Sequence, residues 1–75
     1  MSFQIVMDTK GDTRHEFDAN DPVALAEAAR RFRELTESGY RAIAFNGPSG
    51  TPGELATVFD PKTKKTVFIP QLVGG

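Results

Sequence analysis

A single amphipathic helix set between short β-type segments is the feature that most constrains this fold. Asp21 and Pro22 predict where the helix starts, because an aspartate caps free N–H groups and a proline at the first helical position gives up an N–H that has no partner. Gly39 predicts its end, since glycine readily adopts the left-handed conformation of a C-cap. The residues between them carry an apolar stripe at helical spacing, made of Leu25, Ala28, Ala29, Phe32 and Leu35. The helix therefore has one face to bury, and the other segments must supply the surface that covers it.

The opposite side of this helix is charged. Acidic and basic residues lie at or near i,i+4 spacing, in the pairs Glu27–Arg31, Arg30–Glu34 and Arg33–Glu37. Each such pair stabilises a helix by about 0.2–0.5 kcal/mol. We interpret the arginines as a solvated face rather than as a binding patch.

The segment before the helix reads as a β-hairpin. Residues 3–8 alternate, with Phe3, Ile5 and Met7 on one face, which predicts a half-buried strand with that face toward the core. Residues 9–12 have turn chemistry, and the glycine among them, Gly11, can take a positive φ. The second arm, residues 13–17, is more weakly patterned.

Three further strands are predicted after the helix, over residues 40–46, 55–60 and 66–69. A Gly/Pro-rich loop over residues 47–53 separates the first two, and a polar turn over residues 60–65 separates the last two. The loop contains no lysine and lacks the Gly-Lys-Ser/Thr ending of a phosphate-binding loop, so no nucleotide site is expected there.

This order of elements predicts a two-layer α+β domain, with one helix packed across a mixed sheet. The expected core comprises Phe3, Ile5, Met7, Phe17, Leu25, Phe32, Leu35, Ile43, Phe45, Leu55, Phe59, Val67 and Ile69. If Val67 and Ile69 point at the helix, alternation places Phe68 and Pro70 on the open face. Phe68 beside the small side chains of Ala42 and Ala44 then either docks a partner or packs on a neighbouring loop.

Composition limits the functions to consider. The chain has 75 residues, a net charge of -1 and no cysteine, so we expect one small domain without disulfides, thiolate metal sites or a cysteine nucleophile. The charge removes the usual electrostatic basis for binding nucleic acid or anionic lipid. No apolar run approaches about 20 residues and no signal-peptide pattern is visible, which favours a cytoplasmic protein that does not enter a membrane. The lone His15 lacks a nucleophile or metal partners, so we expect no enzyme, no metal site and no bound cofactor.

The last residues combine a strand end with a diglycine. Pro70 cannot donate to a sheet ladder and so should end the final strand. No turn residue follows in Gln71, Leu72 or Val73, and Gly74 and Gly75 have no Cβ. We therefore expect a domain over residues 1–70 and a flexible tail over residues 71–75 that can enter a narrow slot, although a diglycine alone is not specific.

Together, the order of elements, the length and the tail resemble the β-grasp fold of ubiquitin-like proteins. The tail is similar to that of the small subunit of molybdopterin synthase, a family that commonly ends in Phe-Phe-Pro-Pro-Val-x-Gly-Gly. The matching residues here are Phe68, Ile69, Pro70, Gln71, Leu72, Val73, Gly74 and Gly75. Gln71 departs from the second proline of that family, and Gln71 and Val73 depart from the basic tail of ubiquitin.

The resemblance implies a chain that is a substrate rather than a catalyst. An E1-like activating enzyme would use ATP to adenylate the carboxylate of Gly75, while the chain itself, a monomer, binds no ATP. Docking and threading would involve Phe68, Pro70, Gln71, Leu72 and Val73. Transfer through a conjugating enzyme to target lysines gives a protein modifier, which the departure at Gln71 favours. Sulfide transfer instead gives a sulfur carrier with a terminal thiocarboxylate, and a non-covalent interaction module is the third alternative.

Overall fold

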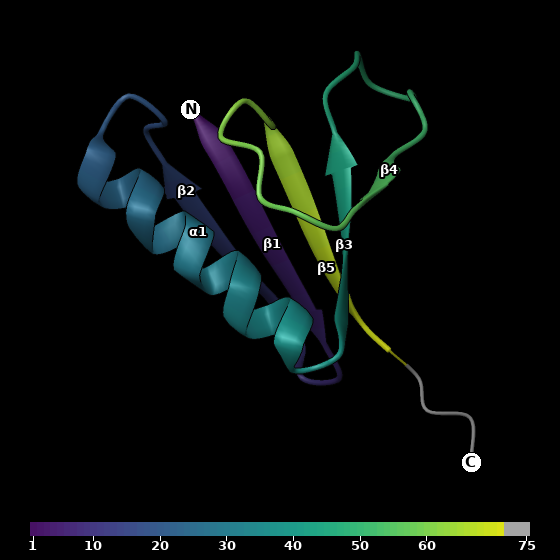
Figure 1. The fold of residues 1–75 in the computed structure, drawn as a ribbon. Coiled ribbons are helices and arrows are strands. Elements are labelled where there is room, and N and C mark those ends of the chain that lie inside the picture. The colour runs from purple at the N-terminus through teal and green to yellow at the C-terminus, as the bar shows by residue number, and fades with distance from the viewer. Residues whose placement is uncertain (72–75) are drawn as a thin grey trace.

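The computed structural model describes residues 1–71 as one helix packed on a five-stranded mixed sheet (Figure 1). The elements are β1 (Ser2–Asp8), β2 (Gly11–Phe17), α1 (Pro22–Glu37), β3 (Tyr40–Phe45), β4 (Glu54–Ala56) and β5 (Lys65–Pro70). The strands lie in the order β2-β1-β5-β3-β4. β1 and β5 are parallel, and the other neighbours are antiparallel. The predicted α+β class is confirmed, and the arrangement is compatible with a β-grasp.

Both predicted ends of α1 are confirmed. The side chain of Asp21 accepts a hydrogen bond from the backbone N–H of Val23 at 3.0 Å, with Pro22 opening the helix. Gly39, just beyond the helix, has a φ of +100°, which few other residues adopt. Within residues 1–71, no helix is long and apolar enough to cross a membrane.

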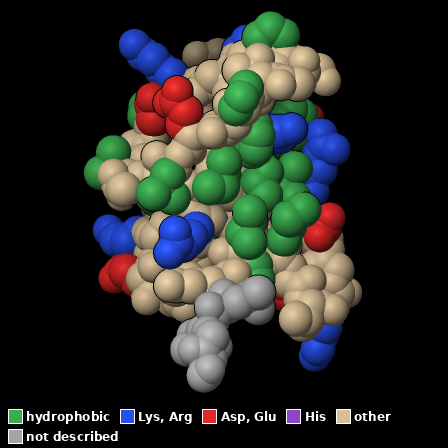
Figure 2. All heavy atoms as spheres, turned by 90° about the vertical axis from the view of Figure 1, so that its right-hand side faces the viewer, with side chains coloured by type: hydrophobic (Ala, Val, Ile, Leu, Met, Phe, Trp, Pro, Cys, Tyr) green, Lys and Arg blue, Asp and Glu red, His purple; other side chains and the backbone are tan. Residues whose placement is uncertain are grey.

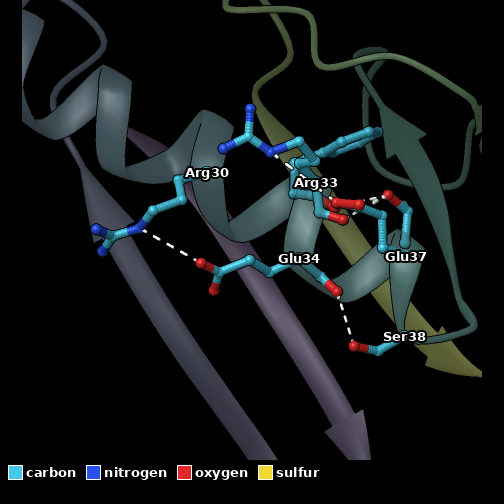
Figure 3. A network of polar contacts seen from close by, with 7 residues as sticks. Arg30, Arg33, Glu34, Glu37 and Ser38 are labelled. Atoms are coloured by element: carbon cyan, nitrogen blue, oxygen red, sulfur yellow. Dashed lines mark hydrogen bonds and ion pairs between the residues drawn. The ribbon is translucent and has the colours of Figure 1, made fainter.

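The outward side of α1 carries two of the three predicted ion pairs (Figure 3). Arg30 lies 3.8 Å from Glu34, and Arg33 lies 4.0 Å from Glu37. All four side chains are largely exposed, so each pair contributes little to stability. The solvated-face interpretation is wrong for Arg31, which is half-buried and donates a hydrogen bond to the side chain of Gln4.

The core lies between α1 and the middle of the sheet. Phe32 of α1 meets Phe68 of β5 edge to face at 5.7 Å between ring centroids, and it meets Phe59 at 6.0 Å. Ala42 of β3 completes the buried cluster. Partly buried side chains packed around this cluster are Val6, Leu35, Tyr40, Ala56 and Phe59.

The predicted orientation is wrong for β1, β3, β4 and β5, because the opposite face of each of these strands meets the helix, whereas Phe17 of β2 lies on the helix side as predicted. On β1 the buried residues are Ser2 and Gln4, whereas Met7 is exposed. On β5, Phe68 is fully buried and Ile69 is 43 % exposed. Side chains of a strand alternate between the two faces of the sheet. If one residue lies on the face opposite to the predicted one, every residue of that strand does.

A polar contact explains how Gln4, only 1 % exposed, is accommodated in this interface. Its Nε2 donates to the backbone oxygen of Ala28 at 2.9 Å, and its Oε1 accepts from Arg31 at 2.7 Å. Both polar atoms are therefore satisfied, which removes most of the cost of burying an amide. The bonds also fix where α1 lies along β1.

The segment between β3 and β5 differs from its prediction in one respect. The strand expected over residues 55–60 is confined to Glu54–Ala56, and the chain then bends so that Phe59 reaches the core. The predicted polar turn is confirmed by hydrogen bonds from the backbone N–H groups of Lys62 and Thr63 to Asp60. β5 ends at Pro70, as predicted.

Candidate docking surface

The face of the sheet opposite α1, here called the open face, carries most of the larger apolar strand residues. Strand pairing aligns side chains of the same face into rows across the sheet. The middle row consists of Arg14, Ile5, Val67, Ile43 and Leu55. The row nearer the start of β1 consists of Glu16, Phe3, Lys65 and Phe45.

Part of this apolar surface is accessible to solvent. Leu55 is 59 % exposed and Met7 is 39 % exposed, while Ile5, Ile43 and Val67 are half-buried. Figure 2 shows hydrophobic side chains gathered on the side of the molecule that carries β3 and β4. Clustered exposed apolar side chains, unlike scattered ones, are typical of interaction surfaces.

The end of β5 lies beside the turn between β1 and β2. Pro70 pairs with Tyr40, and both border a shallow pocket of about 300 Å³ with Asp8, Thr9 and Lys10. This pocket marks where the chain leaves the sheet. Gln71, the next residue, is exposed.

The structure separates the residues predicted for the tail and for docking. Phe68 belongs to the core, so its predicted position on the open face is wrong, and Ile69 occupies that face instead. Pro70, also predicted on the open face, lies on the helix side instead, because it pairs with Tyr40, which packs on the core. Gln71 is exposed. The remaining predicted residues, Leu72, Val73, Gly74 and Gly75, lie outside the described residues.

His15, the only histidine, lies on the helix side of β2, opposite Gln4. Burial lowers the pKa of His15 below its ordinary value of 6.5, and the nearby positive charge of Arg31 lowers the pKa further. Both effects favour the neutral imidazole. Within residues 1–71, no group of three or more His, Asp or Glu side chains is placed to hold a metal ion.

The Gly/Pro-rich loop packs against one end of the open face. A Cβ on Gly53 would lie 2.5 Å from Ile43 and 2.7 Å from Phe45, so only glycine fits there without displacement. The loop borders a pocket of about 510 Å³ together with Phe3, Phe45, Lys64 and Lys65. The loop itself contains no lysine. Lys65, the first residue of β5, and Lys64 before it lie beside the loop.

Comparison with protein-family models, with curated proteins and with solved structures found no match. The candidate site therefore rests on the geometry of this chain. That geometry offers an accessible apolar sheet face, a strand that ends at Pro70, and a pocket at the other end of β5 that Lys64, Lys65 and the Gly/Pro-rich loop border.

The sequence predicted an open face but with the wrong residues, because Ile5, Ile43 and Val67 were assigned to the core and Phe68 to the open face. Alternation identified these residues as sharing a face, and the pairing confirms that they do. The signal that distinguishes the two faces lies in small residues: Ala28 of α1 and Ala42 of β3 are both buried, and they allow the helix to approach the sheet closely.

Proposed function

We propose that this chain is a ubiquitin-like protein whose Gly75 carboxylate is adenylated by a separate activating enzyme and then joined to lysines of target proteins. The supporting observation is that β5, paired between β1 and β3, ends at Pro70, and that Gly74 and Gly75 follow it closely in the sequence. The α+β arrangement supports a stable domain that presents such a sequence.

The chemistry needs no catalytic side chain from this protein. The Gly75 carboxylate attacks the α-phosphorus of ATP, an anhydride bond to AMP forms and pyrophosphate leaves. An enzyme cysteine thiolate then displaces AMP and forms a thioester. The neutral amine of a target lysine attacks the thioester, the thiolate leaves and an isopeptide bond remains.

Glycine at both final positions has a physical reason in this proposal. A backbone without Cβ atoms can lie in a narrow channel that leads to the enzyme's nucleotide. The activating enzyme would bind the open face while the Gly75 carboxylate lies beside the nucleotide.

Mass spectrometry of the N-terminally tagged protein, recovered from its native host under denaturing conditions, tests the proposal. Trypsin cuts after Lys65, so a conjugate would carry residues 66–75 as a branch on a target lysine. The matched control is Gly75→Ala, which should abolish the branched peptide without changing the folded domain. The intact mass also establishes whether Gly75 carries the free carboxylate in the mature protein.

The same measurement separates the alternatives. A sulfur-for-oxygen mass shift at the C-terminus would identify a sulfur carrier instead, because sulfide rather than an enzyme cysteine thiolate would have displaced AMP. The free acid alone, even with the activating enzyme and ATP supplied, would contradict both and leave a non-covalent interaction module.

A further inference from the structure

The pocket beside the Gly/Pro-rich loop, here called the loop pocket, combines aromatic rings with positive charge. Lys65 pairs with Phe3 on one side and with Phe45 on the other, so its side chain stands between two rings on the open face. The Lys65 ammonium lies 5.0 Å from the centre of the Phe45 ring. On the far side of Phe3, the Arg14 guanidinium lies 4.3 Å from the centre of that ring.

The cations of the loop pocket have no acidic partner in the wall. None of the residues that line it is acidic, and Lys64 and Lys65 are both exposed. Among the described residues, the lysine and arginine ion pairs within 4.0 Å are the two on α1. The closest acidic residue in the strand register is Glu16, which pairs with Phe3 on the side away from Lys65.

The walls of the loop pocket are held in place by local contacts. Asn46 accepts a hydrogen bond from the backbone N–H of Lys64 at 3.0 Å, which ties the two lysines to the end of β3. The loop closes on itself through a bond from the Thr51 N–H to the Pro48 oxygen at 3.0 Å. A ligand therefore meets a pre-formed wall and loses less free energy to ordering it.

We propose that the loop pocket binds an acidic, partly hydrophobic segment of a partner protein. Carboxylates of the segment would lie at Lys64 and Lys65, and an apolar side chain between them would contact the rings of Phe3 and Phe45. The segment would continue over the middle row of the open face, which is apolar along Ile5, Val67 and Ile43.

A protein segment fits this pocket better than a phosphate or nucleotide. Phosphate cradles use several convergent backbone N–H groups, whereas here Pro48 has none and the Thr51 N–H is already bonded within the loop. The apolar row beside the pocket also extends the contact beyond the reach of a small anion. Binding at the loop pocket does not depend on activation of Gly75, because only the folded domain takes part in it.

The test is a titration of the ¹⁵N-labelled protein, followed by backbone amide shifts, without enzyme or ATP. The probe is a blocked peptide in which a Leu-Val-Leu segment has two glutamates on each side, and its neutral twin has glutamines instead. We expect the acidic peptide to shift the amides of Phe45, Gly50, Thr51 and Lys65. The double variant K64Q/K65Q should weaken binding at least about fivefold, since it removes two charge-assisted contacts.

The matched control is K10Q/K62Q, which changes the net charge equally at two exposed positions away from the pocket lining. Raising salt from about 50 to about 300 mM should weaken binding to the unaltered protein, which tests the cations even if a variant folds poorly. Equal binding of the neutral twin, or equal weakening by K10Q/K62Q, would overturn the proposal. So would inorganic phosphate or ATP that shifts the same amides as strongly, because the pocket would then be a small-anion site.

Discussion

At the scale of single residues, Gln4 shows how a polar side chain can define an interface. It joins β1 to α1 through Ala28 and Arg31 in a region where almost no water reaches. A buried amide with both polar atoms bonded costs little, but its loss leaves its partners unsatisfied.

We expect Gln4→Ala to lower the free energy of unfolding by about 1–3 kcal/mol, because it removes two hydrogen bonds and leaves a cavity. The matched control is Gln71→Ala, which truncates an exposed glutamine and should change stability by less than about 0.5 kcal/mol. Urea unfolding of the unaltered protein, Gln4→Ala and Gln71→Ala measures the two changes in the free energy of unfolding. Equal stability of the two variants would show that the contact with α1 contributes nothing.

His15 should make stability depend on pH. The pKa of His15 in the folded protein lies below 6.5, so as the pH falls the unfolded chain takes up this proton first. The contribution of His15 to stability should therefore be lost progressively from about pH 6.5 down to its folded-state pKa, and then level off.

Urea midpoints measured between about pH 8 and pH 5 for the unaltered protein and for His15→Gln check this, because the substitution removes only the imidazole. The difference between the two curves should appear on the acid side of pH 6.5. Parallel curves over the whole range would contradict the assignment.

At the scale of the elements, the main result is which face of each strand is covered. Phe68 and Ile69 are neighbours in β5, yet one lies fully buried against Phe32 and the other is 43 % exposed on the open face. Two adjacent apolar residues in a strand therefore have different energetic roles.

Phe68→Ala should cost about 3–5 kcal/mol, the usual range for emptying a buried aromatic site. Ile69→Ala removes an exposed side chain and should cost less than about 1 kcal/mol. Thermal and urea unfolding distinguish the two directly. The reverse order of effects would mean that the originally predicted strand orientation is right.

Gly53 provides a test of whether the Gly/Pro-rich loop packs against the open face. An added methyl would collide with Ile43 and Phe45, so Gly53→Ala should lower stability by about 1–3 kcal/mol through overpacking. Ser49→Ala, in the exposed part of the same loop, is the control and should be close to neutral. If Gly53→Ala left the stability unchanged, the loop would not pack against Ile43 and Phe45 as described.

The sequence was sufficient to predict the helix, its two ends, four of the five strands and the end of β5 at Pro70, because each depends on local chemistry such as the cap at Asp21 and the positive φ of Gly39. The strand expected over residues 55–60 is the exception, because the chain bends after Ala56. The choice of face was not predictable from alternation, which defines two faces equally well. The larger apolar set at Phe3, Ile5 and Met7 favoured the wrong one. The loop pocket was missed because Lys64 and Lys65 lie far along the chain from the loop they border.

At the scale of the whole molecule, β5 joins the two parts of the sheet. It lies between β1, which belongs to the first hairpin, and β3, which follows the helix. Without it, the β1–β2 hairpin and the β3–β4 pair have no direct hydrogen-bonded contact among the described strands.

A fragment ending at Lys64 should therefore fail to fold, with collapsed amide dispersion in its nuclear magnetic resonance spectrum. Adding a synthetic peptide of residues 65–71 should restore native-like dispersion, because it supplies the missing central strand. A scrambled peptide of the same composition is the control. A well-dispersed spectrum from the fragment alone would show that the two parts pair in another way.

The parallel contact between β1 and β5 also sets when the domain can form during synthesis. Among the described strands, β1 is synthesised first and its parallel partner β5 is synthesised last, after β2, β3 and β4. The nascent chain can form its hairpin and helix early, but its sheet stays divided until residues 65–70 emerge. Folding of this domain is therefore a late event, and partners that bind the assembled open face meet only a chain translated through β5.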